Sequence, residues 1–165
     1  MKRFFLKFLF ITLFSIFILR IENIKALVPN YYIPSPSKLR RESIVLSKNA
    51  YQLLYFGRIK EGLNLAKLAV QINKSDERLW LILTEAQIAN NLYDDALISL
   101  KKAEKINSQI SQIYFARSGI YLKNSALKKA KLALETGLKI EPDNYKAIFQ
   151  LANIYLMEKD YFFAI

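Results

Sequence analysis

A repeat with a period of 34 residues constrains this chain more than any other feature of its sequence. Frames that start at Ser43, Glu77, Ser111 and Tyr145 follow one another without an insertion, which gives three full frames and a partial fourth. Small residues recur at three places of the frame. The eighth place holds Ala50, Thr84, Ser118 and Ala152, the twentieth holds Gly62, Ala96, Ala130 and Ala164, and the twenty-seventh holds Ala69, Ala103 and Gly137. A fixed period of this length indicates one supersecondary unit that is stacked several times.

Each frame contains two segments with the pattern of an amphipathic helix. In the second frame, residues 79–89 and 96–103 carry apolar side chains three and four positions apart. Small residues at the recurring places let two helices approach closely, while the bulky ones fill the space to the next unit. Asp76, Asp94 and Asp143 fall near the expected helix starts, where a carboxylate can accept hydrogen bonds from free backbone N–H groups. The pattern predicts an all-α protein built from helix pairs.

Composition excludes several classes of function. The 165 residues include no histidine and no cysteine, so zinc sites, disulfides, thiol nucleophiles and imidazole catalysis are not available to this chain. Only four glycines and four prolines are present, a poor supply of turn formers for a many-stranded sandwich or barrel. We expect no cofactor, no metal and no catalytic residue, and therefore no enzyme activity within these residues.

The repeat resembles the tetratricopeptide repeat (TPR) family. Its signature has Trp, Leu, Gly, Tyr, Ala, Phe, Ala and Pro at the fourth, seventh, eighth, eleventh, twentieth, twenty-fourth, twenty-seventh and thirty-second places. The matching residues are Trp80, Leu83, Ala96 and Ala103 in the second frame, Tyr121, Ala130 and Pro142 in the third, and Leu151, Tyr155 and Ala164 in the fourth. The resemblance implies antiparallel helix pairs stacked in a right-handed superhelical solenoid over residues 43–165, with repeats at 43–76, 77–110, 111–144 and an incomplete 145–165.

The resemblance also implies a concave groove lined by the second, fifth, ninth, twelfth and thirteenth places of each repeat. The predicted partner-binding residues are Tyr51, Tyr55, Arg78, Leu81, Glu85, Phe115, Leu122, Lys123, Lys146, Phe149 and Asn153. Aromatic anchors with scattered cations suit a peptide or protein segment that carries acidic groups. For Tyr51 and Tyr55, packing between helices or against the linker is an equal alternative. Chaperone-binding TPR proteins use Lys and Asn at the fifth and ninth places, where the first frame has Ser47 and Tyr51, so a chaperone-tail adaptor is not expected.

Residues 1–26 have the layout of a targeting segment. Basic residues precede an uncharged run over residues 8–19, and twelve helical residues span about 18 Å, short of a hydrocarbon core of about 30 Å. This length favours a signal peptide that is cleaved after Ala26, and it predicts an extracytoplasmic location of the periplasm or thylakoid-lumen type. The alternative is an uncleaved anchor, with membrane association through residues 4–19.

Residues 27–42 are predicted to form an extended linker, because they contain Pro29, Pro34 and Pro36 and each proline disfavours a helical residue before it. The net charge is +11. Several of the lysines fall on the expected outer helices: Lys101, Lys102, Lys105, Lys128, Lys129, Lys131 and Lys139. No aromatic platform for bases alternates with them, so we interpret them as a solvated convex face and expect no nucleic-acid partner.

The sequence stops one turn into the second helix of the fourth repeat, without a polar helix to cover its last apolar surface. We therefore expect the array to continue or to self-associate at this end. The leading hypothesis is a non-catalytic protein-interaction scaffold, similar in layout to cyanobacterial and plastid TPR proteins that act in assembly. Two alternatives stay open: the recognition arm of a larger enzyme, and a structural oligomer that is joined through the last repeat.

Overall fold

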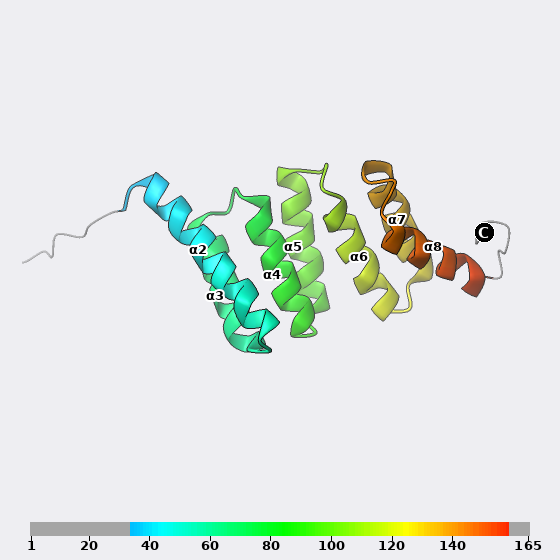
Figure 1. Ribbon diagram of the computed structural model, residues 1–165, viewed down its shortest axis with the longest axis horizontal. Coiled ribbons are helices and arrows are strands. Elements are labelled where there is room, and N and C mark those ends of the chain that lie inside the picture. Colours follow the sequence, from blue (N-terminus) through cyan, green and yellow to red (C-terminus); the bar gives the residue numbers. More distant parts are fainter. Residues whose placement is uncertain (1–33, 159–165) are drawn as a thin grey trace, which may run out of the picture. The chain divides into compact units, whose positions relative to one another are not determined.

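The computed structural model describes residues 34–158, which contain seven helices and no strand. The helices are α2 (Pro36–Tyr55), α3 (Ile59–Ile72), α4 (Glu77–Ala89), α5 (Tyr93–Ile106), α6 (Ser111–Lys123), α7 (Leu127–Ile140) and α8 (Tyr145–Met157). They follow one another in chain order as antiparallel pairs (Figure 1). The prediction of an all-α helical repeat solenoid is confirmed.

The 34-residue register sets where the helices begin. Helices α4, α6 and α8 start at the first place of their frames, and α3, α5 and α7 start at the seventeenth. Helices α2, α4 and α6 each pack on the second helix of their own repeat, and α4, α6 and α8 each pack on the second helix of the repeat before; α2 also contacts α4. Contacts of this kind join only neighbouring elements, which is how a solenoid is built.

Small residues lie where the helices approach most closely. Ala50, Ala96 and Ala130 are fully buried, as are Ala69 and Ala103. Larger side chains fill the space around them in three core clusters. The first cluster includes Leu63 and Leu83, the second includes Leu100 and Ile120, and the third includes Leu134 and Ile154. The spacing of small and bulky residues in the sequence is therefore the packing pattern of the core.

The turn within each of the three complete repeats has the same geometry. The fifteenth place adopts a left-handed backbone, with φ of 75° at Gly57, 60° at Asn91 and 55° at Ser125. In each turn the N–H of the next residue donates to the carbonyl of the eleventh place at 2.8 Å, for example from Leu92 to Gln87. This is the hydrogen bond that closes a helix with a left-handed residue.

The helix caps agree only in part with the sequence analysis. Asp76 caps α4, because its Oδ1 accepts a hydrogen bond from the backbone N–H of Arg78 at 3.1 Å. At α8, Asn144 caps the helix in place of the expected Asp143, and its Oδ1 accepts from Ala147 N at 3.0 Å. Asp94 lies in the first turn of α5 and forms no cap hydrogen bond.

The first helix begins seven residues earlier than its frame. The prediction of an extended linker up to Glu42 is wrong over residues 36–42, which belong to α2. Proline restricts the residue before it, whereas its own fixed φ suits the first turn of a helix, so Pro36 can start α2. The predicted targeting segment, residues 27–33 of the linker and the expected incomplete second helix of the fourth repeat lie outside the described residues. Within the described part, no helix has the length and apolar character needed to cross a membrane.

Candidate partner-binding surface

The five places that were predicted to line a groove separate into exposed and packed positions. The accessible residues come mainly from the second, ninth and thirteenth places of α2, α4, α6 and α8, and we call this set the first-helix face. It includes the exposed residues Tyr51, Tyr55, Arg78, Gln112, Lys123, Lys146 and Asn153 and the partly buried Glu85 and Gly119. Seven of the eleven predicted binding residues belong to it, counting Tyr51, Tyr55, Arg78, Glu85, Lys123, Lys146 and Asn153.

The fifth place is a packing position. Ser47 is 4% exposed and Leu81 is 7% exposed, and Leu81 belongs to the central core cluster. Phe115 is half-buried and packs on the last core cluster, where its Cε1 atom would clash with a Cβ atom placed on Gly137. Leu81 was predicted to contact a ligand, but its side chain is buried in the core, and Phe115 contributes to packing. Phe149 occupies the same place in α8 and is 67% exposed.

The twelfth place is also largely occupied by packing. Leu54 is packed on the first core cluster and Leu122 on the last, and both are half-buried. Leu122 of α6 was predicted as a binding residue, and the structure places it between the core and the surface. Its exposed part adds apolar surface beside the first-helix face.

Aromatic side chains gather at the end of α2. Tyr51 is 55% exposed and Tyr55 is 80% exposed. The ring of Tyr55 meets the ring of Phe56 edge to face, with 5.4 Å between the centroids and an interplanar angle of 81°. Phe56 is 73% exposed and was not predicted as a site residue. Phe56 follows the last residue of α2, so the helical periodicity of the sequence could not assign it to a face.

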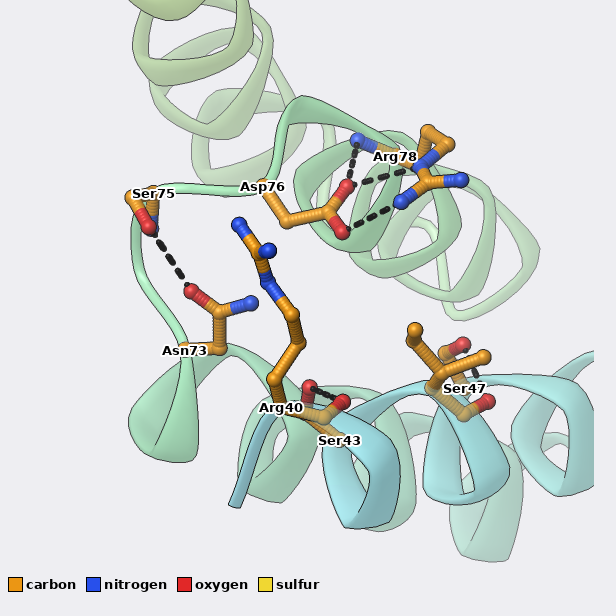
Figure 2. A network of polar contacts seen from close by, with 8 residues as sticks. Arg40, Ser43, Ser47, Asn73, Ser75, Asp76 and Arg78 are labelled. Carbon is orange, nitrogen blue, oxygen red and sulfur yellow. Dashed lines mark hydrogen bonds and ion pairs between the residues drawn. The ribbon is translucent and has the colours of Figure 1, made fainter. Parts of the chain in front are cut away.

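Arg78 is held at the loop that precedes α4. Its guanidinium donates two hydrogen bonds to the Asp76 carboxylate, from Nε at 2.9 Å and from Nη2 at 2.7 Å. Figure 2 shows this pair, with the Arg40 side chain of α2 reaching toward the same loop. The Arg78 hydrogen bonds are the largest cause of a lowered pKa at Asp76, and the charge of Arg40 adds to them. The side chain of Arg78 remains 69% exposed, so part of its guanidinium is accessible to a partner.

A hydrogen bond crosses the first-helix face between the second and third repeats. Gln112 Nε2 donates to Glu85 Oε1 at 3.0 Å. Burial raises the pKa of the Glu85 carboxyl, and the hydrogen bond from Gln112 opposes this shift. Glu85 is half-buried, so a donor from a partner would reach a carboxylate that is already partly removed from water.

Gly119 leaves the middle of the face open. A Cβ atom built on this glycine would have no neighbour within 4 Å, and its backbone is helical. The ninth place therefore changes along the array from Tyr51 through Glu85 and Gly119 to Asn153. Lys123 and Lys146 are exposed on the same side of the third and fourth repeats. Sequence reasoning placed Gly119 on this face but did not recognise the open space.

The first-helix face presents aromatic and charged groups. No group of three or more acidic side chains that could hold a metal ion occurs among residues 34–158, and the chain has no histidine or cysteine. Glu85 is paired with an amide and not with a second acid or a base. The face offers aromatic rings, exposed cations and one partly buried acceptor, which are the groups that recognise a polypeptide.

Comparison with known proteins identifies solved structures with a similar fold. No protein-family model matches the sequence, and no curated protein matches it. Solved structures do match. The first TPR of Spaghetti (RPAP3) bound to the HSP90 peptide SRMEEVD aligns with a TM-score of 0.68 and 18% identity over 72% of this chain and 94% of that one. The Arabidopsis OM64 TPR domain aligns with a TM-score of 0.69 and 16% identity, covering 72% and 98% of the two chains.

A third match carries a bound peptide. The Yersinia enterocolitica type III secretion chaperone SycD, in complex with a peptide of the translocator YopD, aligns with a TM-score of 0.64 and 17% identity over 68% of this chain and 92% of that one. Identities this low describe the fold and leave the ligand undetermined. Together with the 34-residue register and the seven described helices, the alignments show that this chain has the fold of a TPR solenoid.

Proposed function

We propose that this protein is a non-catalytic scaffold that binds a peptide or protein segment along the first-helix face. The proposal is supported by the exposed aromatic and charged side chains of this face and by the peptide complexes of two proteins with the same fold. A role as an assembly factor belongs to the same proposal.

The observation that carries the proposal is the open space over Gly119 in the centre of the face. A solenoid does not require a glycine there, because the equivalent places hold Tyr51, Glu85 and Asn153. Glycine in the middle of a helix costs about 0.5–1 kcal/mol relative to alanine. A segment crossing the array would pass closest to the α6 backbone at this point, between the aromatic end of α2 and the cations of the third and fourth repeats.

The character of the face indicates the kind of segment. The Tyr55 and Phe56 rings offer apolar contact at one end, and Lys123 and Lys146 offer positive charge toward the other. A segment with an aromatic or aliphatic anchor and an acidic group several residues away would satisfy both. The HSP90 tail is not our choice, because the clamp positions of the first repeat hold Ser47, which is buried, and Tyr51.

The test fills the open space without disturbing the core. A random library of 12-residue peptides is selected on the immobilised full chain, and each recovered peptide is measured again with Gly119→Phe and with the matched control Gly119→Ala. We expect peptides that lose at least about tenfold in affinity with the Phe variant and keep their affinity with the Ala variant, while both variants keep the helical circular dichroism of the wild type. If every recovered peptide binds the two variants equally, the first-helix face is not the binding surface.

We also propose an extracytoplasmic location for the folded part. Support comes only from the basic and apolar layout of residues 1–26. Fractionation of cells that express the full chain with a C-terminal tag tests this: recovery outside the cytoplasm is expected, and recovery in the cytoplasm alone would contradict it.

A further inference from the structure

A second hollow lies among helices α5, α6 and α7 and uses a different side of α6. Two adjoining pockets of about 440 Å³ and 380 Å³ share Glu104, Arg117 and Tyr121 as lining residues. We call the two together the outer cleft. Its residues on α6 stand at the fourth, seventh and eleventh places, whereas the first-helix face uses the second, ninth and thirteenth. The outer cleft is therefore separate from the surface described above.

An ion pair supports the floor of the outer cleft. Arg117 Nη2 donates to Glu104 Oε2 at 2.6 Å, and the two side chains are only 18% and 32% exposed. The Arg117 guanidinium also lies over the Tyr114 ring, 5.4 Å from its centroid. The hydrogen bond from Arg117 lowers the pKa of Glu104, so this carboxyl stays ionised and its charge is neutralised within the cleft. The floor is thus close to neutral.

The two sides of the outer cleft repeat the same chemistry. Ile98 on α5 and Leu132 on α7 both occupy the twenty-second place of their repeats, and they are 58% and 65% exposed. Each is accompanied by a lysine, Lys101 on α5 and Lys129 on α7. The first repeat has the polar Asn64 at the same place, so the fold does not demand an apolar residue there. A single exposed aliphatic residue needs no explanation, whereas two that line adjoining pockets bring apolar surface together in one place.

The charged groups at the opening of the outer cleft favour a partner of negative charge. Within residues 34–158, neither Lys101 nor Lys129 takes part in an ion pair, and Lys129 Nζ lies 5.8 Å from the centroid of the Tyr121 ring. With Glu104 neutralised by Arg117, these two lysines leave an excess of positive charge at the opening. The hollow shape favours inserted side chains over a flat lipid surface, and the aliphatic sides contribute nothing to phosphate binding.

We propose that the outer cleft docks an acidic polypeptide segment, whose apolar side chains enter the two pockets while its carboxylates meet Lys101 and Lys129. Shape and apolar contact at Ile98 and Leu132 give affinity, and the lysines give charge selectivity and a dependence on salt. A scaffold with this second surface can hold two polypeptides at once, one on each side of α6.

The experiment uses the peptide library selected on the full chain. Peptides that bind Gly119→Phe as well as the wild type are measured with Ile98→Ser/Leu132→Ser, with Lys101→Gln/Lys129→Gln, and with the control Val45→Ser/Leu68→Ser, which removes two exposed aliphatic residues elsewhere. We expect a class of peptides rich in Asp, Glu and large apolar residues that weakens about tenfold with the first variant and several-fold with the second. The control should leave their affinity unchanged.

Several results would overturn the proposal. One is the absence of any peptide that depends on Ile98 and Leu132, and another is a dependent class without acidic residues. Tighter binding of a single-stranded oligonucleotide or of phosphatidylglycerol vesicles through the same four residues would assign the cleft to another class of partner. These results do not bear on the proposed function of the first-helix face, because that proposal is tested with a different set of peptides, namely those whose affinity falls with Gly119→Phe.

Discussion

The contact between Phe115 and Gly137 gives the sharpest test of the packing described above. Replacement of Gly137 by alanine would make its Cβ clash with Phe115 Cε1 and would place it 2.7 Å from Cδ1. Carbon atoms at optimal separation are about 3.5–4.0 Å apart, so the ring must move by about 1 Å. It cannot do so freely, because Phe115 is packed against the last core cluster.

The magnitude follows from two opposing effects. Overpacking of this kind costs about 1–3 kcal/mol, and alanine gains about 0.5–1 kcal/mol over glycine within a helix. Gly137→Ala should therefore lower the free energy of unfolding by up to about 2 kcal/mol. Gly119→Ala, one helix earlier, meets no atom within 4 Å and should raise that free energy by about 0.5–1 kcal/mol. The two substitutions are chemically identical, and only the surroundings give them opposite signs.

Urea denaturation followed by circular dichroism at 222 nm measures both variants, with Phe115→Leu added in a double-mutant cycle. A smaller ring-free side chain should relieve the clash, so the cost of Gly137→Ala should shrink when Phe115 is leucine, with a coupling of at least about 0.5 kcal/mol. Equal stabilisation by the two glycine substitutions, or a cost that is independent of Phe115, would refute the assignment of Phe115 as a packing residue.

Three further predictions concern a core residue, a helix cap and a partly buried carboxyl of the first-helix face. Ala130→Leu should cost about 1–3 kcal/mol in unfolding free energy, because Ala130 is fully buried at a helix contact; a neutral result would contradict the close-approach argument. Asp76→Ala should cost about 1 kcal/mol at neutral pH. Since its pKa is lowered in the fold, this contribution is complete above the ordinary pKa of an aspartate and is lost as pH falls through the lowered one, so unfolding curves of variant and wild type should converge in acid. Glu85 has a raised pKa, so its ionisation destabilises the fold as pH rises; Glu85→Gln, which keeps an acceptor for Gln112, should gain stability relative to wild type on going from pH 4 to pH 8, and a constant difference would count against the burial effect.

The arrangement of helices could be predicted from the sequence because the information is local and repeated. The small residues at the eighth, twentieth and twenty-seventh places fix the register three times over, and α4, α6 and α8 begin at the first place of their frames as that register requires. The extra length of α2 was missed for a local reason as well. A run of prolines indicates an extended chain, but the last of them, Pro36, starts a helix in place of preventing one.

The site was predicted less well, because exposure depends on what covers a side chain and not on its place in the frame. The fifth place was assigned to the groove from the family resemblance, yet Leu81 and Phe115 turn toward their own second helices. The outer cleft was not predicted at all. Its lysines are indistinguishable in sequence from a solvated convex face, and only the convergence of three helices brings Ile98 and Leu132 to adjoining pockets.

Helix α6 contributes to both proposed surfaces, and its geometry explains how they can act independently. Gly119 is two residues from Arg117 and two from Tyr121, and at 3.6 residues per turn a step of two residues rotates a side chain by about 200°. The two surfaces therefore lie on opposite sides of one helix whose core contacts occupy the remaining positions, Ile113, Ser118 and Ile120 among them. Because those positions are filled by buried side chains, a ligand on one side changes the other only if α6 itself moves against α5 or α7. The repeat fold thus separates the two surfaces by a packed helix. We therefore expect the binding free energies of the two peptide classes to be additive, so that each class binds with the same affinity whether or not the other is bound.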